Sequence, residues 1–141
     1  MTDDQRRGGF TARARSDSAD DRAAAKLLAE VERLRGRFAR AARDGRESFV
    51  SADSDGYDIG MLAVIHLADL VTRQVPADVA ATLPPLARDG LRATRNIAAH
   101  NYAVLDNIRL WLTVSEHAPT LLDALEAALR ASSHDSDSGR A

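Results

Sequence analysis

Apolar residues in this chain recur every three or four positions, and no segment sustains an alternation of apolar and polar residues. The clearest case steps by four and three residues along Leu27, Val31, Leu34, Phe38 and Ala41. That spacing puts side chains on one face of an α-helix, whereas a half-buried strand requires a period of two. The pattern therefore predicts an all-α fold, whose first helix ends near Asp44 and Gly45.

The rest of the chain divides into further predicted helices. A nearly continuous apolar segment at 57–74 predicts a central helix, and a third helix is expected at 86–101. A fourth helix begins after Asp106 as N-cap, with Ile108, Trp111 and Leu112 pointing inward, and continues through 120–131. Residues 47–58 are rich in Ser, Asp and Gly and are expected to form a loop. The sum is a four- to five-helix up-down bundle.

The bundle is expected to span residues 21–131 as one domain. Residues 1–20 contain one large apolar residue, Phe10, and residues 132–141 contain none. Segments of this kind bury too little apolar surface to offset the entropy lost on ordering. We therefore expect a disordered N-terminal arm at 1–20 and a disordered C-terminal tail at 132–141.

Composition excludes several kinds of site. The chain has no cysteine, which removes disulfides, thiolate nucleophiles and Cys-based metal centres. Its histidines form no His-x-x-x-His or His-Glu-x-x-His pair, so we expect no metal site. With a net charge of -2, any binding of nucleic acid must rest on a local cationic patch. The longest apolar run, 59–70, is interrupted by His66 and Asp69, and we expect a cytoplasmic protein with no membrane partner.

The most informative stretch is residues 86–102. One face of this predicted helix carries a row of polar side chains at four-residue steps: Arg88, Arg92, Asn96 and His100. The row combines guanidinium, amide and imidazole groups, and Arg95 lies at its edge. The opposite face is expected to pack on the bundle through Leu86, Gly90, Ala93 and Ile97. Phosphodiester chemistry needs cations, an orienting donor and a group that exchanges protons near neutral pH. On spacing alone, however, a polar helix face with one histidine is more often a solvated face.

A literal motif adds to this pattern. The string from Arg95 to Tyr102, RNIAAHNY, resembles the R-N-x-x-x-H-x-Y motif of the HEPN superfamily, in particular the HepT-like toxins paired with minimal nucleotidyltransferase antitoxins. Asp106, Trp111 and the leucine pattern of the last helix extend the resemblance over residues 23–130. The family's Gly-Glu pair in the central helix is replaced here by Ala68 and Asp69, and its Trp after the proline before the third helix is missing.

The resemblance implies a metal-independent endoribonuclease toxin with a HEPN-like fold, whose site forms across a symmetric homodimer. In that scheme the ribose 2′-hydroxyl attacks the adjacent phosphate, and His100 is the general base or acid. Arg95 neutralises the developing charge, Asn96 orients His100 or donates to a phosphoryl oxygen, and Arg88 and Arg92 are candidate RNA contacts. The resemblance also implies that the nucleotidyltransferase antitoxin transfers AMP to Tyr102. ATP would be the antitoxin's co-substrate, and this chain needs no cofactor.

Two other function classes remain open: a non-catalytic bundle that docks a nucleotidyltransferase, and a module that binds a regulatory nucleotide in the cationic groove. Asp69 also has two interpretations, because it either replaces the family's glutamate or pairs with Arg73 four residues on, and we expect the pairing. The arginines of the first helix are expected to form a solvated face, although they could instead extend an RNA groove. His66 is expected to be a hydrogen-bonded core residue.

Overall fold

The computed structural model describes the backbone of residues 4–100 and 106–139, and the side chains of 18–96, 106–135 and 138–139. Every regular element within those ranges is a helix, which confirms the all-α bundle. In chain order the elements are α1 (Asp4–Ala42), α2 (Gly45–Val50), α3 (Asp55–Asp69), the π-helix η1 (Leu70–Gln74), α4 (Ala77–Ala81), α5 (Pro85–His100), α6 (Asn107–Leu112), the π-helix η3 (Thr113–His117) and α7 (Ala118–Ser138).

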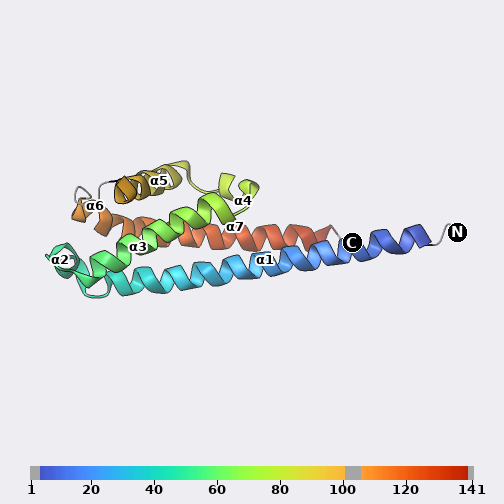
Figure 1. Ribbon diagram of the computed structural model, residues 1–141, viewed down its shortest axis with the longest axis horizontal. Coiled ribbons are helices and arrows are strands. Elements are labelled where there is room, and N and C mark those ends of the chain that lie inside the picture. Colours follow the sequence, from blue (N-terminus) through green and yellow to red (C-terminus); the bar gives the residue numbers. More distant parts are fainter. Residues whose placement is uncertain (1–3, 101–105, 140–141) are drawn as a thin grey trace.

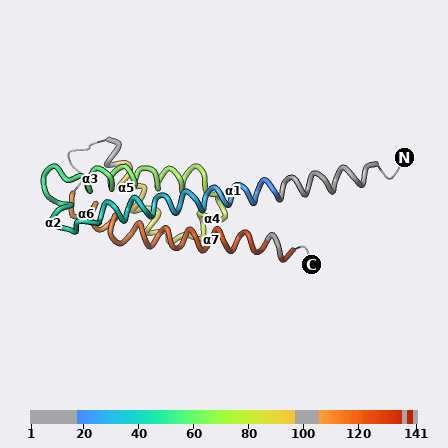
Figure 2. Tube along the Cα trace, turned by 90° about the horizontal axis from the view of Figure 1, so that it is seen from below, coloured from blue at the N-terminus to red at the C-terminus, as the bar shows by residue number. Residues whose placement is uncertain are grey.

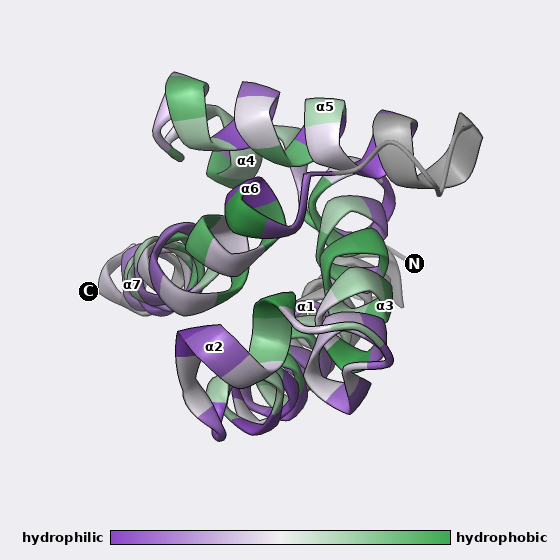
Figure 3. Cartoon of the chain, turned by 90° about the vertical axis from the view of Figure 1, so that its left-hand side faces the viewer, coloured by the Kyte–Doolittle hydropathy of each residue, from purple (hydrophilic) through white to green (hydrophobic). Residues whose placement is uncertain are grey.

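Three long helices form the body of the molecule. α1 packs against both α3 and α7, and Figure 2 shows α1 and α7 running alongside each other along the long axis. α5 lies over α3 and α6, on the side of the molecule away from α1 and α2 (Figures 1 and 3). The short α4 stands beside the first turn of α5 (Figure 1). α5 is therefore an outer helix with surfaces open on both flanks.

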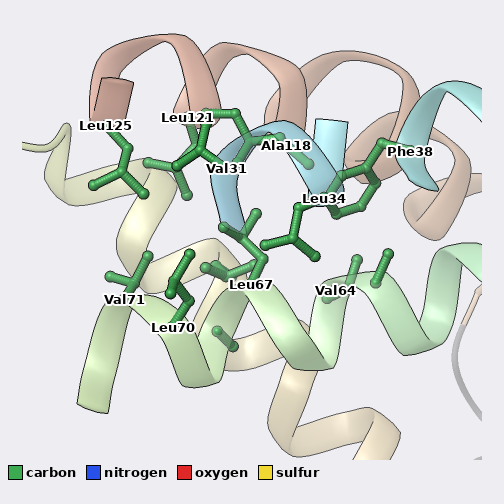
Figure 4. Close-up of a cluster of buried hydrophobic side chains, with 14 of the residues drawn as sticks. Val31, Leu34, Phe38, Val64, Leu67, Leu70, Val71, Ala118, Leu121 and Leu125 are labelled. Carbon is green, nitrogen blue, oxygen red and sulfur yellow. The ribbon is translucent and has the colours of Figure 1, made fainter. Parts of the chain in front are cut away.

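The core lies between α1, α3 and α7 (Figure 4). The predicted stripe of α1 is buried at all five positions, from Leu27 to Ala41, and the four leucines Leu121, Leu122, Leu125 and Leu129 of α7 are buried as well. Val64 and Leu67 of α3 meet them from the opposite side (Figure 4). Full burial of one such side chain contributes about 1.5–3 kcal/mol before entropy is counted, so these helices hold the bundle together.

The predicted loop at 47–58 is wrong except at 51–54, since residues up to Val50 belong to the short helix α2 and residues from Asp55 onward belong to α3. Phe49 explains the difference, because its side chain is only 1% exposed and packs on two other rings. Its ring centroid lies 5.3 Å from that of Trp111 and 6.0 Å from that of Tyr57. α3 then begins after Ser54, whose hydroxyl accepts a hydrogen bond from the backbone N–H of Tyr57.

Asp106 caps α6 as predicted, because its carboxylate accepts a hydrogen bond of 2.9 Å from the backbone N–H of Ile108. The prediction that Ile108 and Leu112 point inward is wrong, since they are 47% and 38% exposed. The core instead receives Leu110 and Val114, which are almost fully buried. The two sets lie on opposite sides of the helix, and Trp111, which packs on Phe49, lies between them.

Both end helices are longer than the sequence pattern predicts. α1 begins at Asp4 instead of near residue 21, and α7 continues to Ser138 instead of ending near residue 131. Extending an existing helix gains one hydrogen bond for each residue fixed, so a helix can continue past the last residue that packs on the core. The described side chains of residues 18–23 are all exposed, so this part of α1 adds nothing to the core. No helix in the described ranges is both long enough and apolar enough to cross a membrane.

Candidate functional site

Leu91 determines how α5 is seated. Its side chain is 6% exposed and Ala87 is half-buried, whereas Leu86 is 87% exposed and Gly90 and Ala93 are also exposed. The prediction that Leu86, Gly90 and Ala93 pack on the bundle is therefore wrong, and the side chain of Ile97, the fourth residue of that prediction, lies outside the described set. Leu91 lies at the edge of the arginine row on a helical wheel, so burying it turns the polar side of α5 toward α3 and η1.

A cleft of about 440 Å³ opens on that polar side, between α5 and the η1–α4 segment. Four of the six predicted site residues line it together: Arg88, Arg92, Arg95 and Asn96. The facing wall is mainly apolar, and none of the described residues that line the cleft is acidic. The arrangement is a cationic groove with an apolar floor, which suits a ligand that carries both phosphate and apolar groups.

Arg95 forms an ion pair with Asp69 at the end of α3. Nη2 of Arg95 lies 3.2 Å from Oδ1 of Asp69, and the two side chains are 35% and 34% exposed. The expected pairing of Asp69 with Arg73 on its own helix is therefore replaced by a contact between helices. Oδ1 of Asp69 has no hydrogen-bond partner within the described chain, so the contact is one of charge without the alignment of a hydrogen bond.

Two guanidinium donors in the cleft are left without acceptors. Nε of Arg88 and Nε of Arg95 are both buried and have no hydrogen-bond partner among the described residues. A buried donor without an acceptor costs about 1–3 kcal/mol. An anion in the cleft could accept from these donors once the two side chains turn toward it, and would then relieve that cost.

The opposite wall of the cleft depends on the π-helix η1. Its wider turn closes with a hydrogen bond of 3.0 Å from the backbone N–H of Val75 to the carbonyl of Leu70. Within it, the hydroxyl of Thr72 donates to the carbonyl of Ala68, one turn earlier. Such π segments occur often at functional sites, since they re-aim side chains without ending the helix. The sequence pattern at 57–74 predicts the helix but carries no signal for this widening.

The two remaining predicted site residues are His100 and Tyr102, at or beyond the last described residue of α5. His100 is the last residue of α5, about 7.5 Å along the helix axis from Arg95, and its side chain is outside the described set. Tyr102 lies outside the described residues altogether. Arg95 and His100 thus share one helix.

The arginines of α1 form a separate surface. Arg33 pairs with Glu30 at 2.7 Å, and Arg40 is exposed. Nη1 of Arg37 lies 3.0 Å from Nδ1 of His66 on α3. Because a guanidinium only donates, Nδ1 of His66 is the acceptor and carries no proton in this contact. His66 is hydrogen-bonded as predicted, but it is half-buried at the surface of the α1–α3 contact instead of lying in the core.

A second groove, of about 640 Å³, flanks the other side of α5. It runs between α5 and the α6–η3–α7 segment, and its lining is mainly apolar, with Leu86 and Leu112 among the exposed contributors. α5 therefore separates a cationic cleft from an apolar groove.

Comparison of the chain with family models, curated proteins and solved structures finds no match. The chemistry of the site is therefore inferred from its own residues. Among the described side chains, no group of three or more potential metal ligands is present.

Proposed function

We propose that this chain is a metal-independent endoribonuclease toxin of the HepT-like type, with Arg95, Asn96 and His100 as its catalytic residues. The observation that carries the proposal is the cleft beside α5, in which Arg95 and Asn96 stand together with Arg88 and Arg92. An exposed row of arginines would be expected to point into solvent. Here Arg88 and Arg95 are half-buried, and all four residues line a cleft whose facing wall is mainly apolar, as a groove for a phosphate-bearing ligand requires.

The reaction follows from the residues of the motif. The ribose 2′-oxygen bonds to the adjacent phosphorus while the bond from phosphorus to the 5′-oxygen breaks, which leaves a 2′,3′-cyclic phosphate and a free 5′-hydroxyl. One imidazole of His100 accepts the proton of the 2′-hydroxyl, and a protonated imidazole supplies one to the leaving oxygen. Arg95 stabilises the charge on the phosphoryl oxygens, and Asn96 orients His100 or donates to one of those oxygens. The attacking group belongs to the substrate, so the step needs no metal-bound nucleophile.

A symmetric homodimer with a HEPN-like fold would bring two copies of His100 to one site, so that one acts as base and the other as acid. The exposed apolar side of α5 supports this part of the proposal. Leu86, at 87% exposure, and the apolar groove beside it are surfaces that an isolated subunit leaves in water.

The toxin would be controlled at Tyr102, two residues after His100. In the proposed scheme a nucleotidyltransferase antitoxin transfers AMP from ATP to Tyr102. The added phosphodiester brings negative charge and bulk next to the site, and therefore repels the RNA backbone. Both partners, and the RNA, would meet in the cytoplasm.

The test is cleavage of total RNA by purified protein in the presence of a chelator, after mass spectrometry has shown that Tyr102 carries no adenylate. Wild type is expected to cut, and Arg95→Ala and His100→Ala are expected to lose about 10²-fold or more in rate. Tyr102→Phe is expected to cut like wild type but to resist silencing by an antitoxin. Arg43→Ala changes an exposed arginine in the turn between α1 and α2, and is the matched control for loss of one charge.

If unmodified wild type cuts no faster than His100→Ala, the ribonuclease proposal is rejected. Stabilisation of the same protein by ATP, with RNA left intact, would then favour a nucleotide-binding module. Binding of a nucleotidyltransferase without either activity would favour a docking module.

A further inference from the structure

The cleft beside α5 is lined from Asn96 and Arg95 back to Arg88, which lies in the first turns of the helix. This end of α5 is the one nearest α4 (Figure 1). Nε of Arg88 is buried without an acceptor in the described part of the chain, as is Nε of Arg95. Buried polar groups are normally hydrogen-bonded, so each of these donors would gain from an acceptor, which it could reach once its side chain turns toward the cleft. The proposed reaction uses only the one at Arg95.

Arg88, Arg92 and Arg95 form a row along one side of the cleft. At about 1.5 Å per residue, Arg88 and Arg95 are separated by about 10 Å along the helix axis, with Arg92 between them. A single phosphate does not reach both ends of such a row. A nucleic-acid strand carries one charge for each nucleotide, so a row of this length suits successive phosphates of one strand.

The facing wall distinguishes a strand from a free anion. That side of the cleft is lined by apolar side chains, among them Val71 of η1, Val75 directly after it and Ala80 of α4. A strand whose phosphates follow the arginines can place its sugars and bases against this wall. A free phosphate ion has no apolar part to bury there, and gains nothing from it.

We propose that Arg88 binds a phosphate that does not react, beside the reacting phosphate at Arg95, so that the RNA strand lies along α5 with its flanking nucleotide toward α4. The identity of the strand as RNA rests on the proposed function. The subsite itself rests on the buried donor and the shape of the cleft.

The test measures binding of short single strands of 2′-O-methyl RNA, which have no free 2′-hydroxyl and are not cleaved. Fluorescence anisotropy would compare wild type with Arg88→Ala, and with Arg43→Ala as the matched loss of one exposed charge. In parallel, each phosphate of the strand is replaced in turn by a neutral methylphosphonate. Arg88→Lys keeps the charge but removes the Nε–H donor, and circular dichroism monitors folding of every variant.

Arg88→Ala is expected to weaken binding about tenfold, as the loss of one charge-assisted hydrogen bond implies. The slope of log affinity against log salt should fall by about 0.7, the value for one phosphate of a single strand. A methylphosphonate at one flanking position should weaken wild type similarly but leave Arg88→Ala unaffected, because both changes remove one contact. Arg88→Lys is expected to recover only part of the affinity, and Arg43→Ala to bind like wild type.

Additive losses at every phosphate position would overturn the subsite, as would an equal loss for Arg43→Ala. The subsite would also be overturned if inorganic phosphate displaced the strand at constant ionic strength and bound as tightly as the strand does. If Arg88→Ala and a methylphosphonate at one position are non-additive but natural RNA is not cleaved, the ribonuclease proposal is rejected and the phosphate subsite at Arg88 is retained. If natural RNA is cleaved but the two losses are additive, the phosphate subsite is rejected and the ribonuclease proposal is retained.

Discussion

Nη2 of Arg95 lies 3.2 Å from Oδ1 of Asp69, and this contact joins the end of α3 to the middle of α5. The two residues are far apart in sequence, and the structure brings them to the edge of the cationic cleft. An anion that binds Arg95 must share the guanidinium with Asp69 or displace it. Asp69 is therefore both a support for Arg95 and a competitor for any phosphate in the cleft.

Asp69→Asn is expected to strengthen binding of a short 2′-O-methyl RNA strand by about two- to fivefold. The amide keeps the shape of the side chain but removes the charge that competes with phosphate for Arg95. Because the pair is partly exposed, the free energy of unfolding should fall by no more than about 1 kcal/mol. Fluorescence anisotropy and urea denaturation measure the two effects.

Asp89→Asn is the control for Asp69→Asn, since Asp89 is an exposed carboxylate on α5 itself. Equal gains in the two variants would mean that only the overall charge matters. Weaker binding by Asp69→Asn would show that Asp69 acts on the ligand only by holding Arg95 in place, and that competition is absent.

The local periodicity of the sequence was sufficient to predict much of this fold. The apolar stripe that includes Val31 and the N-cap Asp106 depend on residues within one or two turns, and both are as predicted. The same holds for the grouping of Arg88 with Asn96 in the cleft, because helical spacing alone puts them on one side. These features need no knowledge of neighbouring helices.

The features that the sequence did not predict depend on contacts between helices. Burial of Leu91 rotates α5, and the apolar side that includes Leu86 is exposed as a result. The pairing of Asp69 with Arg95 follows from that same rotation, and no spacing on α3 predicts it. The helix α2 likewise depends on Phe49, which docks on a ring that lies more than fifty residues further along the chain.

Gly56→Ala is expected to destabilise the bundle by about 1–3 kcal/mol. A Cβ at this position would lie 2.5 Å from the carbonyl oxygen of Ala41 and 3.3 Å from a ring carbon of Phe49, so α1 and α3 would have to move apart. Gly36→Ala is the matched control, because a Cβ there meets nothing within 4 Å. It should instead stabilise α1 by about 0.5–1 kcal/mol. Urea denaturation gives both values, and a Gly56→Ala variant as stable as wild type would contradict the close approach at Gly56.

Arg35→Met is expected to destabilise the contact between α1 and α7 by no more than about 1 kcal/mol. Arg35 reaches across to α7, where Nη2 lies 2.7 Å from Oε2 of Glu126 and Nη1 bonds to Asp123. The hydrogen bond to Asp123 is the main cause that raises the pKa of Arg35 above its ordinary value.

A raised pKa in the folded state gives stability that is fully present below the unfolded pKa, and is lost only as pH rises through the folded value. For an arginine that loss falls far above the working range. Urea denaturation of wild type and Arg35→Met at about pH 6 and about pH 9 should therefore give the same difference. If the difference in free energy of unfolding between wild type and Arg35→Met became smaller at the higher pH, another titrating group would be responsible for the contact.

Leu86→Lys is expected to shift the protein from dimer to monomer while leaving the subunit folded. Leu86 is 87% exposed, so the substitution removes nothing from the core. A lysine there would place two like charges near the twofold axis of the proposed dimer, where each would be desolvated on association. Leu62→Lys is the matched control, because Leu62 is an exposed leucine on α3, at 50% exposure. Analytical ultracentrifugation measures the outcome: dissociation by Leu86→Lys alone supports pairing through α5, whereas dissociation by Leu62→Lys alone would place the interface on α3.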